Sequence, residues 1–177
     1  LLVARLVEEG KYYFLARPRR FGKSLLVNTL AAAFAGEREL FAGLHLEHPW
    51  DWNRHAPVIV LDFSEGVLDS RQRLNQRIQR ILDIQTKAQN LALHQEEVSD
   101  RLEELVLKLH ASRGERVVVL VDEYDKPILD HLHQPERALE LREGLRNLYS
   151  VLKSQDARLR FVLLTGVSKF SKVSLFS

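Results

Sequence analysis

Phe21, Gly22, Lys23 and Ser24 follow a short aromatic run and precede an apolar stretch of helical character. A glycine lets the backbone approach a bound group closely, a lysine adds positive charge, and a serine hydroxyl can bind Mg²⁺. Free N–H groups at a helix start also attract anions. The segment therefore predicts a phosphate-binding loop for ATP with Mg²⁺ at Ser24. The residues expected to contact the nucleotide are Arg19, Arg20, Phe21, Gly22, Lys23, Ser24 and Leu25.

The loop departs from the common phosphate-loop pattern G-x-x-x-x-G-K-[ST] at its first position, where Arg17 replaces glycine. Pro18 fixes its own φ angle and biases Arg17 towards an extended backbone. We therefore expect the chain to enter this loop differently from the common form. The alternative is an arginine-rich surface turn without a ligand.

Carboxylates follow a second chemically informative segment, VVVLVDEYD at 117–125. Asp122, at the end of this apolar run, is expected to complete the Mg²⁺ site, and Glu123 to activate the water that attacks the γ-phosphate. A strand ending in solvated acids explains this segment equally well alone, but the phosphate-loop segment favours a nucleotide site. Tyr124 and Asp125 either orient this region or cap a helix beginning at Pro127.

Thr165 ends a further apolar run, RFVLLTG at 160–166. If the sheet places this strand centrally, the hydroxyl can bond to the γ-phosphate or to the attacking water. The alternative is a turn threonine before Gly166. Lys23, Glu123 and Thr165 are therefore the candidate catalytic residues.

Alternating strand and helix patterns predict an α/β sandwich. Unbroken apolar runs are typical of parallel strands covered on both faces, whereas apolar residues three or four apart indicate helices packed by one side. The expected strands are 12–16, 58–64, 115–125 and 160–166. Helical patterns cover 1–9, 25–34, 73–82, 98–109 and 138–152, and Gly36 is expected to close the second of these.

The composition limits the class of protein. A chain of 177 residues, 45% hydrophobic and 28% charged, predicts one globular domain, and zero cysteine excludes disulfides and thiolate zinc sites. No apolar run approaches the roughly 20 residues of a membrane span, so we expect a cytoplasmic protein with no membrane partner. Because the chain begins at Leu1 and lacks methionine, we expect a piece of a longer protein.

Two groups of arginines leave a nucleic-acid partner open, although the net charge of +2 does not itself imply one. The first group surrounds the expected loop, and the second forms one side of an expected helix, where a solvent-facing surface is the alternative. The groups are Arg17, Arg19 and Arg20, and Arg73, Arg77 and Arg80.

Four segments in order, YYFLARPRRFGKSLL, LDFS, VVVLVDEYDKPI and FVLLTGVSKFSKVSLFS, resemble the AAA-ATPase-like family of prokaryotic ATP-binding proteins, from end to end. The resemblance implies a P-loop NTPase three-layer sandwich of the additional-strand (ASCE) type, with a mainly parallel sheet. It also implies a Walker A core, a Walker B pair and a sensor-1 residue. These are Gly22, Lys23 and Ser24, then Asp122 and Glu123, then Thr165.

Members of this family frequently continue into a helical lid and a domain resembling PD-(D/E)XK nucleases. Neither is visible before Ser177, so we expect residues 1–177 to form a single P-loop ATPase core truncated before the lid. We expect this core to hydrolyse Mg·ATP and so drive a conformational or assembly switch, within a homo-oligomer or with a partner protein. The alternatives are a nucleotide-gated binding module with negligible turnover and a nucleic-acid-interacting regulator.

Overall fold

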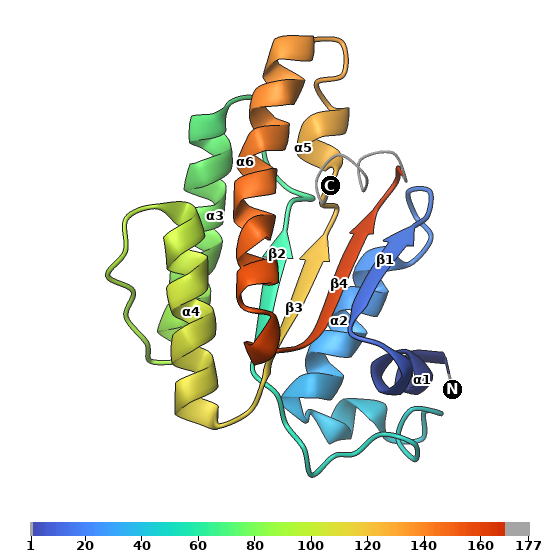
Figure 1. Ribbon diagram of the computed structural model, residues 1–177. Helices are drawn as coiled ribbons and strands as arrows, with labels where there is room; N and C mark the ends of the chain where they lie inside the picture. Colours follow the sequence, from blue (N-terminus) through green and yellow to red (C-terminus); the bar gives the residue numbers. More distant parts are fainter. Residues whose placement is uncertain (1, 169–177) are drawn as a thin grey trace.

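The computed structural model describes residues 2–168, in which four strands form one sheet (Figure 1). The strands are β1 (Tyr12–Ala16), β2 (Val58–Asp62), β3 (Val117–Asp122) and β4 (Leu159–Gly166). Their order across the sheet is β1-β4-β3-β2, and every neighbouring pair is parallel. The expected α/β class with a parallel sheet is confirmed. The end of the last family-like segment, 169–177, lies outside the described residues.

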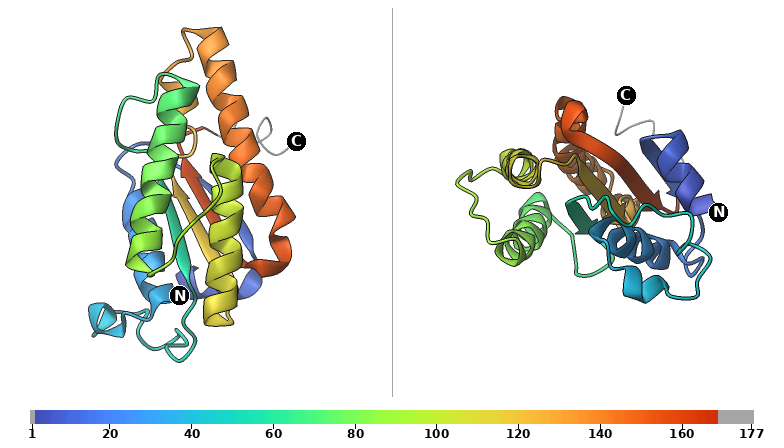
Figure 2. Two further views of the ribbon diagram at one scale, coloured as in Figure 1. Left: turned by 90° about the vertical axis from the view of Figure 1, so that its left-hand side faces the viewer. Right: turned by 90° about the horizontal axis from the view of Figure 1, so that it is seen from below.

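Helices cover both faces of this sheet (Figure 2). One face packs against three long helices, and the other packs mainly against α2. The α-helices are α1 (Leu2–Glu9), α2 (Lys23–Ala35), α3 (Arg71–Ala88), α4 (Val98–Arg113), α5 (Lys126–Leu129) and α6 (Pro135–Ser154). Short 3₁₀ helices span Arg38–Phe41 and Asp156–Arg158. None of the helices within 2–168 is long and apolar enough to cross a membrane.

Strand β3 lies at the centre of the core, and all six of its residues are buried. Because successive strand side chains point to opposite faces, Val119 and Val121 pack with α3, α4 and α6. Val118 and Leu120 pack with α2. The unbroken apolar run therefore serves two cores, as expected for a parallel strand with helices on both faces.

The expected element boundaries differ most at the ends of two strands. β1 spans the expected residues, and α2 ends at Ala35, followed by Gly36 in the left-handed conformation (φ 84°). In contrast, β2 stops two residues before 64, and β3 occupies only the middle of 115–125. The early end of β3 has a local cause, because Glu123 has a left-handed backbone (φ 51°) that no strand can contain.

Candidate functional site

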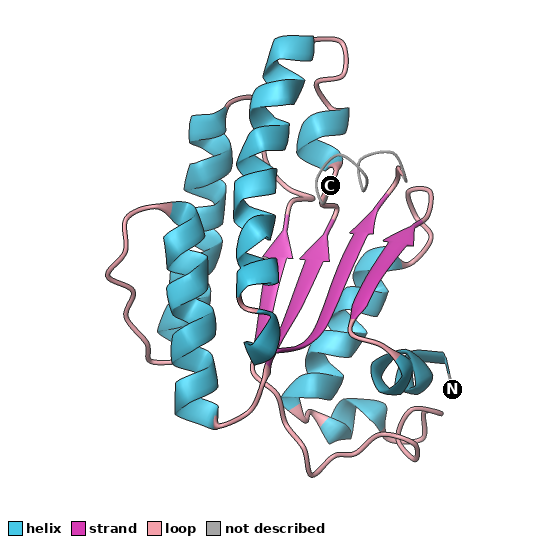
Figure 3. Ribbon diagram, viewed as in Figure 1, coloured by secondary structure: helices cyan, strands magenta, loops and turns pink. Residues whose placement is uncertain are grey.

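The four strands point the same way, so their carboxyl ends lie together at one edge of the sheet (Figure 3). The predicted chemistry-bearing residues lie at these strand ends or in the chain that follows them. Beyond β1 the chain forms the loop that leads into α2, and Asp122 and Thr165 lie at the ends of β3 and β4. The backbone N–H of Arg17 donates to the carbonyl of Gly166 at 3.1 Å, which ties the loop to the end of β4. In open parallel sheets, ligands bind at this edge.

Left-handed residues shape the loop that opens α2. Gly22, with φ 74°, occupies the N-cap position, where no side chain caps the helix. The first N–H groups of an α-helix have no acceptor within the helix. A Cβ built on Gly22 would meet no heavy atom within 4 Å, so the helix start faces open space. Open space before uncapped N–H groups fits a bound phosphate.

The entry to this loop explains why arginine is tolerated at its first position. Arg17 does not have a positive φ, and its N–H extends the pairing of β1 with β4. The left-handed positions are instead Arg20 (φ 67°) and Gly22. Arg17 therefore occupies a backbone conformation that a non-glycine residue adopts without strain.

Lys23 is the buried cation of the loop, with 4% of its surface exposed. Its ammonium group donates to the carbonyl oxygen of Pro18 at 3.1 Å and thereby closes the loop on itself. Burial raises the pKa of the nearby Asp125 carboxyl, and the positive charge of Lys23 is one of the smaller effects that oppose this rise. An anion at the start of α2 would find this positive charge already held within the loop.

The ends of β3 and β4 meet in a small polar cluster. The Thr165 hydroxyl, fully buried, donates to Asp122 Oδ1. The backbone N–H of Glu123 reaches both residues, at 3.1 Å from Asp122 Oδ1 and 3.2 Å from Thr165 Oγ1. The three residues predicted for Mg²⁺ binding, water activation and γ-phosphate contact are therefore adjacent. Within 2–168, Asp122 makes no hydrogen bond to Lys23 or Ser24.

The other predicted nucleotide contacts lie on the surface around the loop. Phe21 and Leu25 are 66% and 71% exposed, although both are large apolar side chains. Arg19 is exposed and forms a long ion pair with Asp130, at 3.8 Å. Arg20 and Ser24 are exposed as well.

Tyr124 and Asp125, which directly follow the acidic pair, are both buried, and the sequence does not indicate this burial. Asp125 is 1% exposed, and its Oδ2 accepts hydrogen bonds from the N–H groups of Val167 and Ser168, at 3.0 and 2.7 Å. Burial raises the pKa of this carboxyl, and the two N–H groups oppose that effect. The capping alternative is right about position, because Asp125 occupies the N-cap of α5, but its side chain makes no cap bond there.

Two of the three arginines in the second group make contacts within the protein, and the third, Arg80, is exposed. Arg77 is only half-exposed, donates to the carbonyl oxygen of Asp62 at 3.2 Å and pairs with Glu65 at 3.7 Å. Arg73 pairs with Asp69 at 3.4 Å. The expectation of a purely solvent-facing stripe is therefore wrong for Arg77, whose guanidinium group holds the end of β2.

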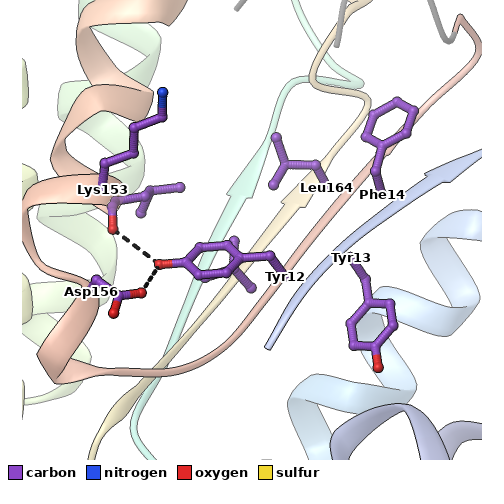
Figure 4. Close-up of a pocket in the computed structure, with 8 residues that line it drawn as sticks. Tyr12, Tyr13, Phe14, Lys153, Asp156 and Leu164 are labelled. Carbon is purple, nitrogen blue, oxygen red and sulfur yellow. Dashed lines mark hydrogen bonds between the residues drawn. The ribbon is translucent and has the colours of Figure 1, made fainter. Parts of the chain in front are cut away.

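An apolar cavity of about 440 Å³ lies elsewhere, between α6 and the face of β1 and β4 (Figure 4). Tyr12 and Phe14 line it, and the Tyr12 hydroxyl bonds to Asp156 at 2.5 Å. Burial, followed by that carboxylate, raises the pKa of Tyr12. None of the predicted site residues lines this cavity. The described residues contain no group of three His, Asp or Glu side chains that could hold a metal ion.

Comparison with known proteins gives the relationship of the chain. A family model described as "Predicted AAA-ATPase" matches residues 1–176. A protein of Azotobacter chroococcum mcd 1, described as an uncharacterized protein in the vnfD 5' region, is 56% identical over 173 residues. That match covers 98% of this chain but only 34% of the relative, and no solved structure matches. The chain belongs to the AAA-ATPase-like family.

Proposed function

We propose that the chain is an ATP-binding core that hydrolyses Mg·ATP, and that hydrolysis drives a conformational or assembly switch. One observation carries the proposal: the loop holding the buried Lys23 is bonded to the end of β4, next to the cluster of Thr165, Asp122 and Glu123. Phosphate capture and water activation would thus share one edge of the sheet. The chain spans about a third of the length of the relative. Any activity of a longer protein that contains this core is therefore part of the same proposal.

The strand order supports an additional-strand (ASCE) P-loop domain. β4 lies between β1, which leads into the loop, and β3, which ends in the acidic pair. This order brings Thr165 beside Asp122, from 43 residues away in the sequence. The loop that follows β1 then lies on one side of Thr165, and the acidic pair at the end of β3 lies on the other. A γ-phosphate that contacts the Thr165 hydroxyl would therefore lie between Lys23 and Glu123.

In the proposed mechanism, Lys23 stabilises the charge that develops on the phosphate oxygens, and Thr165 contacts the γ-phosphate. Glu123 positions the attacking water and accepts its proton. Ser24 and Asp122 would hold Mg²⁺, since hydroxyl and carboxylate oxygens are ligands that this ion prefers. When bound, Mg²⁺ supplies positive charge to the phosphate oxygens.

Nucleotide binding requires one hydrogen bond of the described state to change. The Thr165 hydroxyl has a single hydrogen, so it must turn from Asp122 to donate to a phosphate. The Lys23 ammonium has three N–H groups, one of which binds the carbonyl of Pro18, so another can reach a phosphate. The turn of the Thr165 hydroxyl is a local response of the kind that a switch needs.

The test compares Mg·ATP binding and turnover in wild type, Lys23→Ala and Glu123→Gln, with Lys87→Ala as an exposed control on α3. We expect Lys23→Ala to lose binding and Glu123→Gln to keep binding while turnover falls by about 100-fold or more. A folded wild-type chain that binds no Mg·ATP would refute the proposal. Binding without turnover in the wild type would instead support the nucleotide-gated module.

A nucleic-acid-interacting regulator is the second candidate, and the exposure of Arg19 and Arg20 favours it. These arginines lie beside the exposed Phe21, and an aromatic ring next to cations is suited to unpaired bases. Affinity for single-stranded DNA or RNA that falls steeply with salt, and falls further in Arg19→Ala/Arg20→Ala, would support this candidate. Absence of binding at low salt would remove it.

A further inference from the structure

Four successive residues, from the last residue of β3 onward, are hydrogen-bonded to the end of β4 or to the residues that follow it. Asp122 and Glu123 bind Thr165, as described above. Tyr124 continues the series twice, because its N–H donates to the Thr165 carbonyl at 2.9 Å and its hydroxyl to the Ser168 carbonyl at 3.0 Å. Asp125 completes it through its bonds to the N–H groups of residues 167 and 168.

Backbone geometry directs the last two of these residues inward. The left-handed Glu123 turns the chain sharply, after which Tyr124 and Asp125 are 0% and 1% exposed. They pack so closely under Gly166 that a Cβ at this position would lie 2.4 Å from the Tyr124 ring and 2.7 Å from Asp125 Oδ1. The packing requires glycine directly after Thr165.

The chemistry of Asp125 indicates a specific task. Burying a carboxylate is unfavourable unless its oxygens are well bonded, and an apolar side chain would fill the same space at lower cost. Here Oδ2 accepts from two successive N–H groups, whereas Oδ1 receives no hydrogen bond from residues 2–168. The carboxylate is thus suited to fixing the backbone N–H groups of Val167 and Ser168, which lie two and three residues after Thr165.

We propose that Asp125 is a positioning residue, which with Tyr124 clamps residues 167–168 and so holds the backbone of Thr165 beside Asp122 and Glu123. This inference rests on the proposed function, in which Thr165 contacts the γ-phosphate. The clamp fixes the chain after Thr165, and the pairing of β3 with β4 fixes the chain before it. With its backbone held on both sides, Thr165 keeps its hydroxyl next to the acidic pair, from where the hydroxyl can turn to the γ-phosphate.

The experiment uses Asp125→Ala and Asp125→Asn, with Asp100→Ala as an exposed aspartate control on α4. Asparagine keeps one oxygen that can accept from both N–H groups, and alanine keeps none. Amide hydrogen exchange is measured without nucleotide at Val167 and Ser168, and at Val119 in β3 as a reporter of global unfolding. ATP affinity and turnover are measured on the same samples.

In Asp125→Ala we expect protection at Val167 and Ser168 to fall by about tenfold or more while Val119 stays protected. Turnover should fall by about tenfold or more with ATP affinity within about threefold of wild type. Asp125→Asn should restore both protection and turnover, and the control should match the wild type. A purely structural role would not separate turnover from affinity in this way.

Four outcomes overturn the inference. Unchanged protection in Asp125→Ala would mean that the clamp does not hold residues 167–168, and lost protection with normal turnover would mean that the clamp positions nothing. An asparagine variant as defective as alanine would assign the effect to the charge. A wild type without turnover would refute the proposed function itself, and with it the positioning role, while exchange at Val167 and Ser168 would still decide whether the clamp exists.

Discussion

Gly166→Ala is expected to destabilise the fold by about 2–4 kcal/mol, through steric contact alone. The added methyl carbon would lie 2.4 Å from a Tyr124 ring carbon, and ordinary contact begins at 3.4 Å, so the ring must move by about 1 Å. Adding a methyl group to a packed core typically costs about 1–3 kcal/mol. Movement of the ring also strains the two hydrogen bonds that Asp125 accepts from the N–H groups of Val167 and Ser168. Each of these bonds contributes about 1 kcal/mol.

The assay is reversible denaturant unfolding, with Gly114→Ala as the matched control. Gly114 follows α4 with φ 67°, and a Cβ there would meet no heavy atom within 4 Å. Its substitution therefore carries only the backbone cost of a left-handed alanine, about 1 kcal/mol. Gly166 lies in a strand without a positive φ, so its cost reports packing.

A loss below about 0.5 kcal/mol for Gly166→Ala, or one no larger than for Gly114→Ala, would refute the packing argument. The origin of the cost is tested by a double-mutant cycle with Tyr124→Leu, which removes the ring carbons in question. We expect Gly166→Ala to cost at least about 1 kcal/mol less in that background. Equal costs in both backgrounds would show that the tyrosine ring is not the obstacle.

Phe34→Ala should destabilise by about 3–5 kcal/mol, because the ring is fully buried between other aromatic rings; calorimetry measures the loss. Ser70→Ala should cost about 1 kcal/mol in denaturant unfolding, since the Ser70 hydroxyl caps α3 by accepting from the Arg73 N–H at 3.3 Å. A hydrogen bond from the Lys108 ammonium lowers the pKa of Glu104 from 4.5 to about 2, and hydrogen bonds from two backbone N–H groups add to this effect. Stability from Glu104 is thus full above pH 4.5 and lost as pH falls towards 2, and unfolding across this range should depend less on pH in Glu104→Gln.

Local sequence patterns were sufficient to predict most elements of the fold. The run at 12–16 and the apolar segment in 117–122 are strands because continuous branched and aromatic side chains suit a sheet covered on both faces. The predicted strand 115–125 extends past β3 because no glycine or proline marks the end of the strand before Pro127. Only the backbone of Glu123 shows the turn, and a left-handed glutamate has no sequence signature.

The candidate site was predictable as a set of residues but not as a set of contacts. Lys23 could be named because it opens the helix that follows β1, and Asp122 because it ends β3, where chemistry is expected. The bond from Thr165 to Asp122 depends on β4 lying between β1 and β3, and spacing along the chain does not determine that order. The same holds for Asp125, whose partners lie 42 and 43 residues away.

The described chain places two of its three left-handed non-glycine residues at the candidate site. Asn90, the third, follows α3, where asparagine adopts this conformation at little cost. Arg20 and Glu123 are not residues that favour it, and each such conformation typically costs about 1–3 kcal/mol. One shapes the loop before Gly22, and the other turns Tyr124 and Asp125 under β4. Glycine would adopt either angle more easily, so we infer that the side chains themselves are the reason for the strain. In the proposed function Glu123 positions the attacking water, and Arg20 is among the residues expected to contact the nucleotide.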